Sequence, residues 1–69
     1  MTDEDRAALA FERLTWRNAG AKDTAIRERL GVTPTRHYQR IYALIQTPEA
    51  LAFDPVLVNR LRRMAKLAA

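Results

Sequence analysis

Two short helical segments joined by a glycine turn occupy residues 22–45, and they constrain the fold more than any other feature of the chain. Before the turn, Ile26 and Leu30 are four residues apart, so they lie on one face of a helix. Gly31 supplies the turn itself. After it, Thr33 can cap a second helix, and the proline that follows suits a first helical position because its missing N–H group is not needed there. The spacing predicts a helix-turn-helix.

Helical periodicity continues through the rest of the chain, and no stretch alternates as a strand would. The expected helices cover residues 3–18, 22–30, 34–46 and the segment from 55 onward, with a short helical turn over 47–53. Gly20 is expected to end the first helix in the left-handed conformation. We therefore expect one all-α domain over residues 1–69, a small four-helix bundle with a helix-turn-helix and a short extra helical turn. A chain of 69 residues buries only a marginal core, so tight packing or a partner subunit is expected to contribute.

Apolar residues at helical spacing predict which faces are buried. The expected inward residues are Ala7, Ala10, Phe11 and Leu14; Ile26 and Leu30; Tyr38, Ile41, Tyr42 and Ile45; and Leu57, Leu61, Met64 and Ala68. Val58 is expected at the edge of the last face, and Leu67 on its flank with partial cover.

The net charge of +4 comes entirely from the second half of the chain. Residues 1–35 contain six acidic and six basic side chains, whereas residues 36–69 contain six basic and two acidic ones. This asymmetry suggests a polyanionic partner, with nucleic acid first and an acidic membrane or protein second. A solvated basic surface without a partner is the open alternative.

The second helix of the predicted motif has a basic outward face. With Tyr38 placed inward at about 100° per residue, Arg36 and Arg40 fall on the opposite side, flanked by Gln39 and His37. Arginine can bind guanine in a bidentate manner, glutamine can read adenine, and either can hold phosphate. We therefore expect these four side chains to contact double-stranded DNA, with ordinary solvated residues as the alternative.

Phosphate contacts are expected around this face. Thr33 and Thr35 offer hydroxyl and backbone N–H groups at the start of the helix. Arg62, Arg63 and Lys66 form a second basic strip on the last helix. That strip is equally well explained as the solvated side of a C-terminal helix, where positive charge suits the dipole.

The register of the motif departs from the usual repressor-type template. Counting from Gly31, apolar residues are expected six and nine positions later, where this chain has His37 and Arg40. The apolar Tyr38 and Ile41 come one residue late. Either the turn is one residue longer or the helix is rotated, so the docking face stays open.

Leu9 and Trp16 form a second apolar stripe on the first helix, away from its main inward face. We expect the stripe to be core, covered by the last helix, because large apolar side chains are mostly buried. The alternative is a homodimer or partner surface, since an exposed patch of this kind is costly to leave wet.

The residue inventory gives no catalytic set. His37 is the single histidine and there is no cysteine, so neither a metal cluster nor an activated nucleophile is expected. Gly20 and Gly31 are the only glycines, which leaves no phosphate-cradling loop. We expect no enzymatic activity, no cofactor, no metal and no small-molecule substrate. The acidic N-terminus and the absence of a long apolar run point to a cytoplasmic protein rather than a membrane protein.

A string of short motifs along residues 9–63 resembles a small actinobacterial family that also occurs in actinobacterial phages. The segments that carry the resemblance are Ala10–Arg13, Trp16, Ala19–Lys22, Ala25–Glu28, Thr35–Arg36, Tyr38–Gln39, Leu44–Ile45, Pro48–Leu51, Asp54–Pro55 and Leu57–Arg62. The family was long catalogued as a domain of unknown function with a helix-turn-helix, and at least one member is described as a nucleoid-associated DNA-binding protein. The resemblance implies DNA binding with modest sequence selectivity.

This chain departs from the family pattern in three places. The pair His37-Tyr38 stands where an aromatic pair is common, Thr15 where an aromatic or apolar residue is common, and the chain ends soon after Arg63. A change on the DNA-facing helix alters which DNA is preferred, and a change beside Trp16 alters packing or dimerisation.

The leading hypothesis is a helix-turn-helix DNA-binding protein that is nucleoid-associated or regulates transcription. The alternative is a protein-interaction module, a phage or host adaptor that binds an acidic protein partner through the Leu9/Trp16 stripe or the basic helix face. Salt dependence separates the two, because phosphate contacts weaken steeply with salt and apolar contacts do not.

Overall fold

The structure is a computed structural model that describes the backbone of residues 1–68 and the side chains of residues 1–66. Its elements are α1 (Asp3–Phe11), α2 (Ala19–Ala25), the π-helical turn η1 (Ile26–Leu30), α3 (Pro34–Leu44), α4 (Pro48–Phe53) and α5 (Pro55–Ala68). Because η1 continues α2 without a break, the two form a single bent helix. The described residues contain no strand, and the all-α prediction is confirmed.

Side-chain caps begin the helices at the predicted places. Thr33 accepts a hydrogen bond from the Arg36 backbone N–H at 3.2 Å, and Thr47 accepts one from the Ala50 N–H. Asp54 does the same for Leu57 at the start of α5. Each of these three helices has proline in its first turn. The starts of α3, α4 and α5 were therefore readable from residue type alone.

The first helix is shorter than expected. It ends at Phe11 rather than Asn18, and residues 12–18 form an irregular connection. Asn18 instead caps α2 through a 2.8 Å hydrogen bond from the Ala21 N–H, so Gly20 lies inside a helix and does not terminate one. Tertiary packing explains the early end, because it lets Trp16 fold back and stack on Phe11 at 5.1 Å between ring centroids.

The core consists of two clusters. The larger joins α1, α3, α4 and α5 and contains Ala8, Leu9, Ile41, Leu44, Ile45, Ala50, Leu57 and Val58. The smaller joins the end of α1 to the bent helix and contains Phe11, Ala25 and Ile26, with Trp16, Leu30 and Val32 packed against it.

The buried face of α3 is rotated from the predicted one. Ile41 and Ile45 are buried as expected, but Tyr38 and Tyr42 are 42% and 62% exposed. His37 and Leu44 take their places in the core. Periodicity failed here because histidine was counted as polar, whereas this histidine is buried with a carboxylate partner.

The buried faces of α1 and α5 also differ from the predicted ones. In α1 the core residues are Ala8, Leu9 and Phe11. Phe11 is buried as predicted, whereas the expected Ala7 and Ala10 are exposed, as is Leu14 beyond the end of the helix. In α5 Leu57 is buried as predicted, Val58 lies in the core instead of at its edge, and Met64 is exposed. The predictions for the Leu67 and Ala68 side chains lie outside the described side chains.

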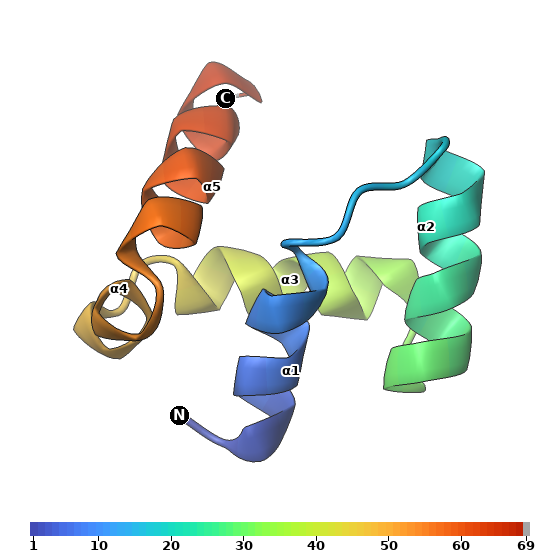
Figure 1. Ribbon diagram of the computed structural model, residues 1–69, viewed down its shortest axis with the longest axis horizontal. Helices are drawn as coiled ribbons and strands as arrows, with labels where there is room; N and C mark the ends of the chain where they lie inside the picture. The colour runs from blue at the N-terminus through green and yellow to red at the C-terminus, as the bar shows by residue number, and fades with distance from the viewer. Residues whose placement is uncertain (69) are drawn as a thin grey trace.

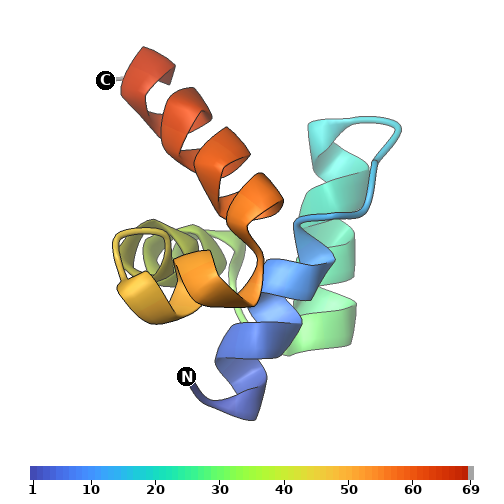
Figure 2. The ribbon, with the colours of Figure 1, turned by 60° about the vertical axis from the view of Figure 1, so that its left-hand side comes forward.

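In Figure 1, α3 runs behind α1 from α4 at one end to the lower end of the bent helix at the other. Figure 2 shows α5 leading away from α1 and α3 toward the C-terminus. No helix in the described part of the chain has both the length and the apolarity that a membrane crossing requires.

Candidate nucleic-acid interface

The outer side of α3 is a polar surface. Thr35, Arg36, Gln39 and Ala43 are all exposed. They lie away from the face that packs on α1, since His37, Ile41 and Leu44 occupy that face. Of the predicted DNA-contacting residues, Thr33, Thr35, Arg36 and Gln39 are brought together at the N-terminal half of one helix.

Acidic residues of α1 partly compensate the positive charge of this surface. The Nε atom of Arg40 lies 3.9 Å from an Asp5 carboxylate oxygen, and the Arg40 side chain is only partly exposed. The first turn of α1 carries Asp3, Glu4 and Asp5 together. Arg36 has no ion-pair partner among the described residues. It is therefore the least compensated positive charge on the α3 face.

The prediction that His37 contacts DNA is wrong. Its side chain is 1% exposed, and its Nε2 atom lies 3.1 Å from a Glu12 carboxylate oxygen. Its ring packs edge-on against Phe11 at 5.5 Å. The clue was available in the sequence, because His37 stands six residues after Gly31, where the motif requires an inward residue.

No pattern in the sequence indicated a structural role for Glu12. It is buried between the end of α1, α2 and α3, and it also accepts a 3.0 Å hydrogen bond from the Lys22 ammonium. Burial alone would raise the pKa of Glu12, but hydrogen bonds from His37 and Lys22 outweigh it and hold that pKa below its usual value. The three side chains thus fix α3 against α1 and α2.

The residues of the C-terminal basic strip, Arg62, Arg63 and Lys66, differ in their surroundings. The Arg62 Nε atom donates a hydrogen bond to the carbonyl of Ile45, the residue that ends α3, so this guanidinium joins α5 to α3. Arg62 is therefore only partly exposed, whereas it was expected on the side of the helix opposite the buried face. Arg63 and Lys66 are exposed as expected.

A second ion pair anchors α5. Arg13 forms two hydrogen bonds to the Asp54 carboxylate, at 2.5 and 2.7 Å. Arg13, together with the Leu57 N–H that the carboxylate also accepts, lowers the pKa of Asp54 against a smaller opposing effect of burial. No local sequence pattern predicts an ion pair between residues that are 41 positions apart.

The Leu9/Trp16 stripe does not form a surface. Leu9 is fully buried against Leu57 and Val58 of α5, so the expectation that it is core is confirmed. Trp16 is partly buried and stacks on Phe11 in the smaller cluster, and α5 does not belong to that cluster. The alternative, that the stripe is a homodimer or partner surface, therefore loses Leu9.

Within residues 1–68, no group of three or more histidine or acidic side chains is arranged to hold a metal ion.

Comparison with known proteins identifies a family but no characterised relative. Neither the curated proteins nor the solved structures include a significant match to this chain. A family model described as Protein of unknown function (DUF3263) matches residues 1–67, which is nearly the whole chain. The chain therefore belongs to the DUF3263 family.

Proposed function

We propose that this protein binds double-stranded DNA through a helix-turn-helix formed by the bent helix α2–η1, the turn at Gly31 and α3. The protein would act as a nucleoid-associated or transcription-regulating factor. In this proposal α3 enters the major groove with its outer face toward the base edges.

The exposed polar face of α3 is the observation that carries the proposal. Packing of His37, Ile41 and Leu44 against the core turns Gln39 directly outward, with Arg36 beside it. Glutamine can pair with adenine and arginine with guanine in the major groove. The left-handed Gly31, with φ of 68°, supports the sharp turn that a helix-turn-helix needs between its helices.

Phosphate contacts would come from residues at the start of α3 and from exposed basic residues of α5. The Thr33 hydroxyl already caps the helix, so its contribution would be through nearby backbone N–H groups, while the Thr35 hydroxyl is exposed. Arg63 and Lys66 would add charge contacts. With few base-reading groups, we expect modest selectivity, consistent with the family resemblance and with a nucleoid role.

The test is fluorescence anisotropy with labelled 20-base-pair duplexes, comparing Arg36→Ala with Arg27→Ala as a matched control. Both arginines are exposed and helical, but Arg27 lies on η1 outside the α3 face. We expect Arg36→Ala to weaken binding about tenfold and Arg27→Ala to change it less than about twofold. Wild-type affinity should fall with a log–log salt slope of about −5, for six phosphate contacts.

Equal affinity of the folded Arg36→Ala and wild-type proteins would refute the assignment of α3 as the DNA-facing helix. Wild-type protein that fails to bind any duplex at low salt would refute DNA binding altogether. The protein-interaction alternative would then be the one to pursue, with the basic face of α3 as its surface, because Leu9 of the Leu9/Trp16 stripe is buried.

A further inference from the structure

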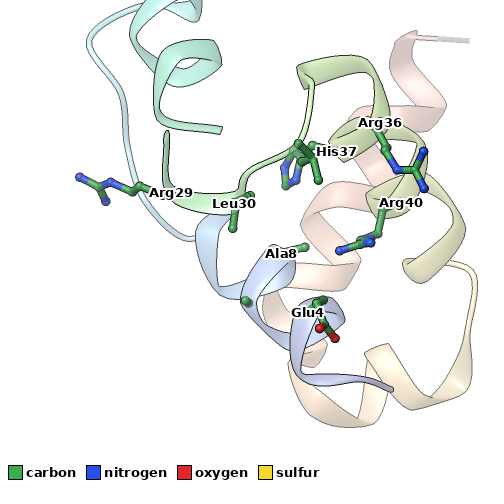
Figure 3. Close-up of a pocket in the computed structure, with 9 residues that line it drawn as sticks. Glu4, Ala8, Arg29, Leu30, Arg36, His37 and Arg40 are labelled. Carbon is green, nitrogen blue, oxygen red and sulfur yellow. The ribbon is translucent and has the colours of Figure 1, made fainter. Parts of the chain in front are cut away.

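A cleft of about 210 Å³ opens between α1, the end of η1 and the first turns of α3. Figure 3 shows it in close-up. Its apolar lining comes from Ala7 and Ala8 of α1 together with Leu30 and Val32 around the turn. Two consecutive alanines on the α1 side, of which Ala7 is exposed and Ala8 buried, leave this space open at the surface.

Arg36 and Arg40 stand one helical turn apart on the α3 side of the cleft. In Figure 3 the Arg40 side chain extends from α3 toward α1, across the cleft. Arg29 also lines the cleft, but its guanidinium lies 5.3 Å from the Trp16 ring centroid and points away in the same view. Glu4 is the one acidic side chain of the lining. The Arg36 guanidinium is directed away from the cleft in Figure 3, and Arg40 lies 3.9 Å from an Asp5 carboxylate oxygen. The cleft is thus apolar within, with the Arg40 charge at its edge.

The wall of the cleft contains a buried polar atom without a partner. His37 lines the cleft and is 1% exposed. Its Nε2 atom is occupied by Glu12, but its Nδ1 atom is buried and has no hydrogen-bond partner among the described residues. Buried polar atoms without a hydrogen-bond partner are uncommon in native structures.

We propose that this cleft binds a small carboxylate with an apolar tail, whose anionic head is held by Arg40 and by Arg36 once its side chain turns toward the cleft, and whose tail lies against Ala7, Ala8 and Leu30. The ligand is bound and not converted. The site shares these two arginines with the proposed DNA-binding surface.

Size and charge select this class of ligand. The cleft of about 210 Å³ suits a benzoate-sized molecule. A single guanidinium can donate two parallel hydrogen bonds to the two oxygens of a carboxylate. Glu4 at the edge would repel a ligand that carries further negative charges, so dianions such as phosphate are disfavoured.

The same two arginines also line a shallow hollow on the outer side of α3, together with Gln39, Ala43 and Asp5. An anion in the cleft would neutralise charges that face DNA, so the bound ligand would weaken DNA binding. This consequence, unlike the binding itself, rests on the proposed function.

Ligand binding is tested without DNA, by ¹H–¹⁵N NMR titration of the whole protein with sodium benzoate. We expect saturable shifts confined to amides around residues 7–8, 30–32 and 36–40, with a Kd at or below about 1 mM. Benzamide, the neutral analogue, and inorganic phosphate should give no such shifts. Equal shifts from benzamide or phosphate would overturn the carboxylate assignment, and shifts scattered over the protein would overturn the site.

Two alanine variants on the same helix separate a site effect from a stability effect. Ala7→Leu places a larger side chain in the cleft, whereas Ala10→Leu adds the same atoms at an exposed position of α1 outside it. We expect Ala7→Leu to abolish the benzoate shifts and Ala10→Leu to preserve them. Equal responses of the two folded variants would overturn the proposal.

The coupling to DNA is then measured by anisotropy at constant ionic strength, with sodium benzoate replaced by sodium chloride in the control. Weaker DNA binding in benzoate, absent in Ala7→Leu, is the expected result. Benzoate binding without any effect on DNA affinity would overturn the coupling. If the wild-type protein bound no DNA, the proposed function would fail while the NMR titration still decided whether the cleft is a carboxylate site.

Discussion

Replacement of Glu12 by glutamine should destabilise the fold strongly, because it removes the buried carboxylate that pairs with the Lys22 ammonium and shares a hydrogen bond with His37. The Glu12 side chain is 5% exposed and the Lys22 side chain 22% exposed, with 3.0 Å between ammonium and carboxylate. Breaking a buried ion pair by removing one partner costs about 3–5 kcal/mol. The partial exposure of Lys22 allows some rehydration, so we expect a loss of about 3 kcal/mol.

That loss is large for a domain of this size. At about 0.05–0.15 kcal/mol per residue, 69 residues give a total stability of about 3–10 kcal/mol. For small domains each kcal/mol shifts Tm by about 4–8 °C, so Glu12→Gln should lower Tm by about 12–24 °C. Urea unfolding followed by far-UV circular dichroism at neutral pH, together with thermal melts, measures both quantities.

Glu28→Gln is the matched control, since it makes the same chemical change at an exposed position on η1. It should alter the free energy of unfolding by less than about 0.5 kcal/mol. The double variant Glu12→Gln with Lys22→Met should lose less than the sum of the two single variants, because neither charge is then left unpaired. A Glu12→Gln protein as stable as the Glu28→Gln control would refute the role given to this cluster.

Three further predictions follow from individual contacts. Gly31→Ala should cost about 1 kcal/mol of unfolding free energy in urea titrations, because its φ of 68° disfavours a Cβ atom although no neighbour lies within 4 Å; Gly20→Ala, in a helix, should cost nothing, and equal losses would contradict this reasoning. Asp5→Asn should strengthen DNA binding by about two- to threefold in anisotropy titrations at low salt, because it removes the negative charge beside Arg40; weaker binding would count against the α3 face. The pKa of Asp54 is lowered in the folded protein, so its stabilising contribution is complete above the unfolded pKa and is lost as pH falls from about 5 through the lowered pKa; Asp54→Asn should flatten the dependence of urea stability on pH in that range, and an unchanged pH profile would exclude this carboxylate as its source.

Local signals determined where most helices begin. Thr33, Thr47 and Asp54, each followed by proline, marked three helix starts that the structure confirms, and Gly31 marked the turn before α3. These predictions succeeded because a cap or a glycine turn depends on atoms within a few residues of one another. The left-handed conformation itself was expected at Gly20 and is found at Gly31. The same locality explains why the all-α class was readable from periodicity.

The candidate DNA-binding site could be predicted only in part from the sequence. Arg36 and Gln39 were placed on the outer face of α3 from helical spacing, and the structure leaves both exposed. Whether that face binds DNA stays a prediction. His37 was assigned to the surface because its polarity was judged without its partner, although the spacing from Gly31 already indicated an inward position.

By itself, then, the sequence determined the helical class, the helix starts and the excess of positive charge in its second half, all of which depend on residue type and short spacing. Tertiary structure alone decided the rotation of α3, the early end of α1 and the arginines that remain unpaired. Glu12 meets His37 across 25 residues and Asp54 meets Arg13 across 41, and such pairings satisfy buried charges that no local rule can assign. The side of α3 that faces solvent was therefore determined by which of its residues pack in the core.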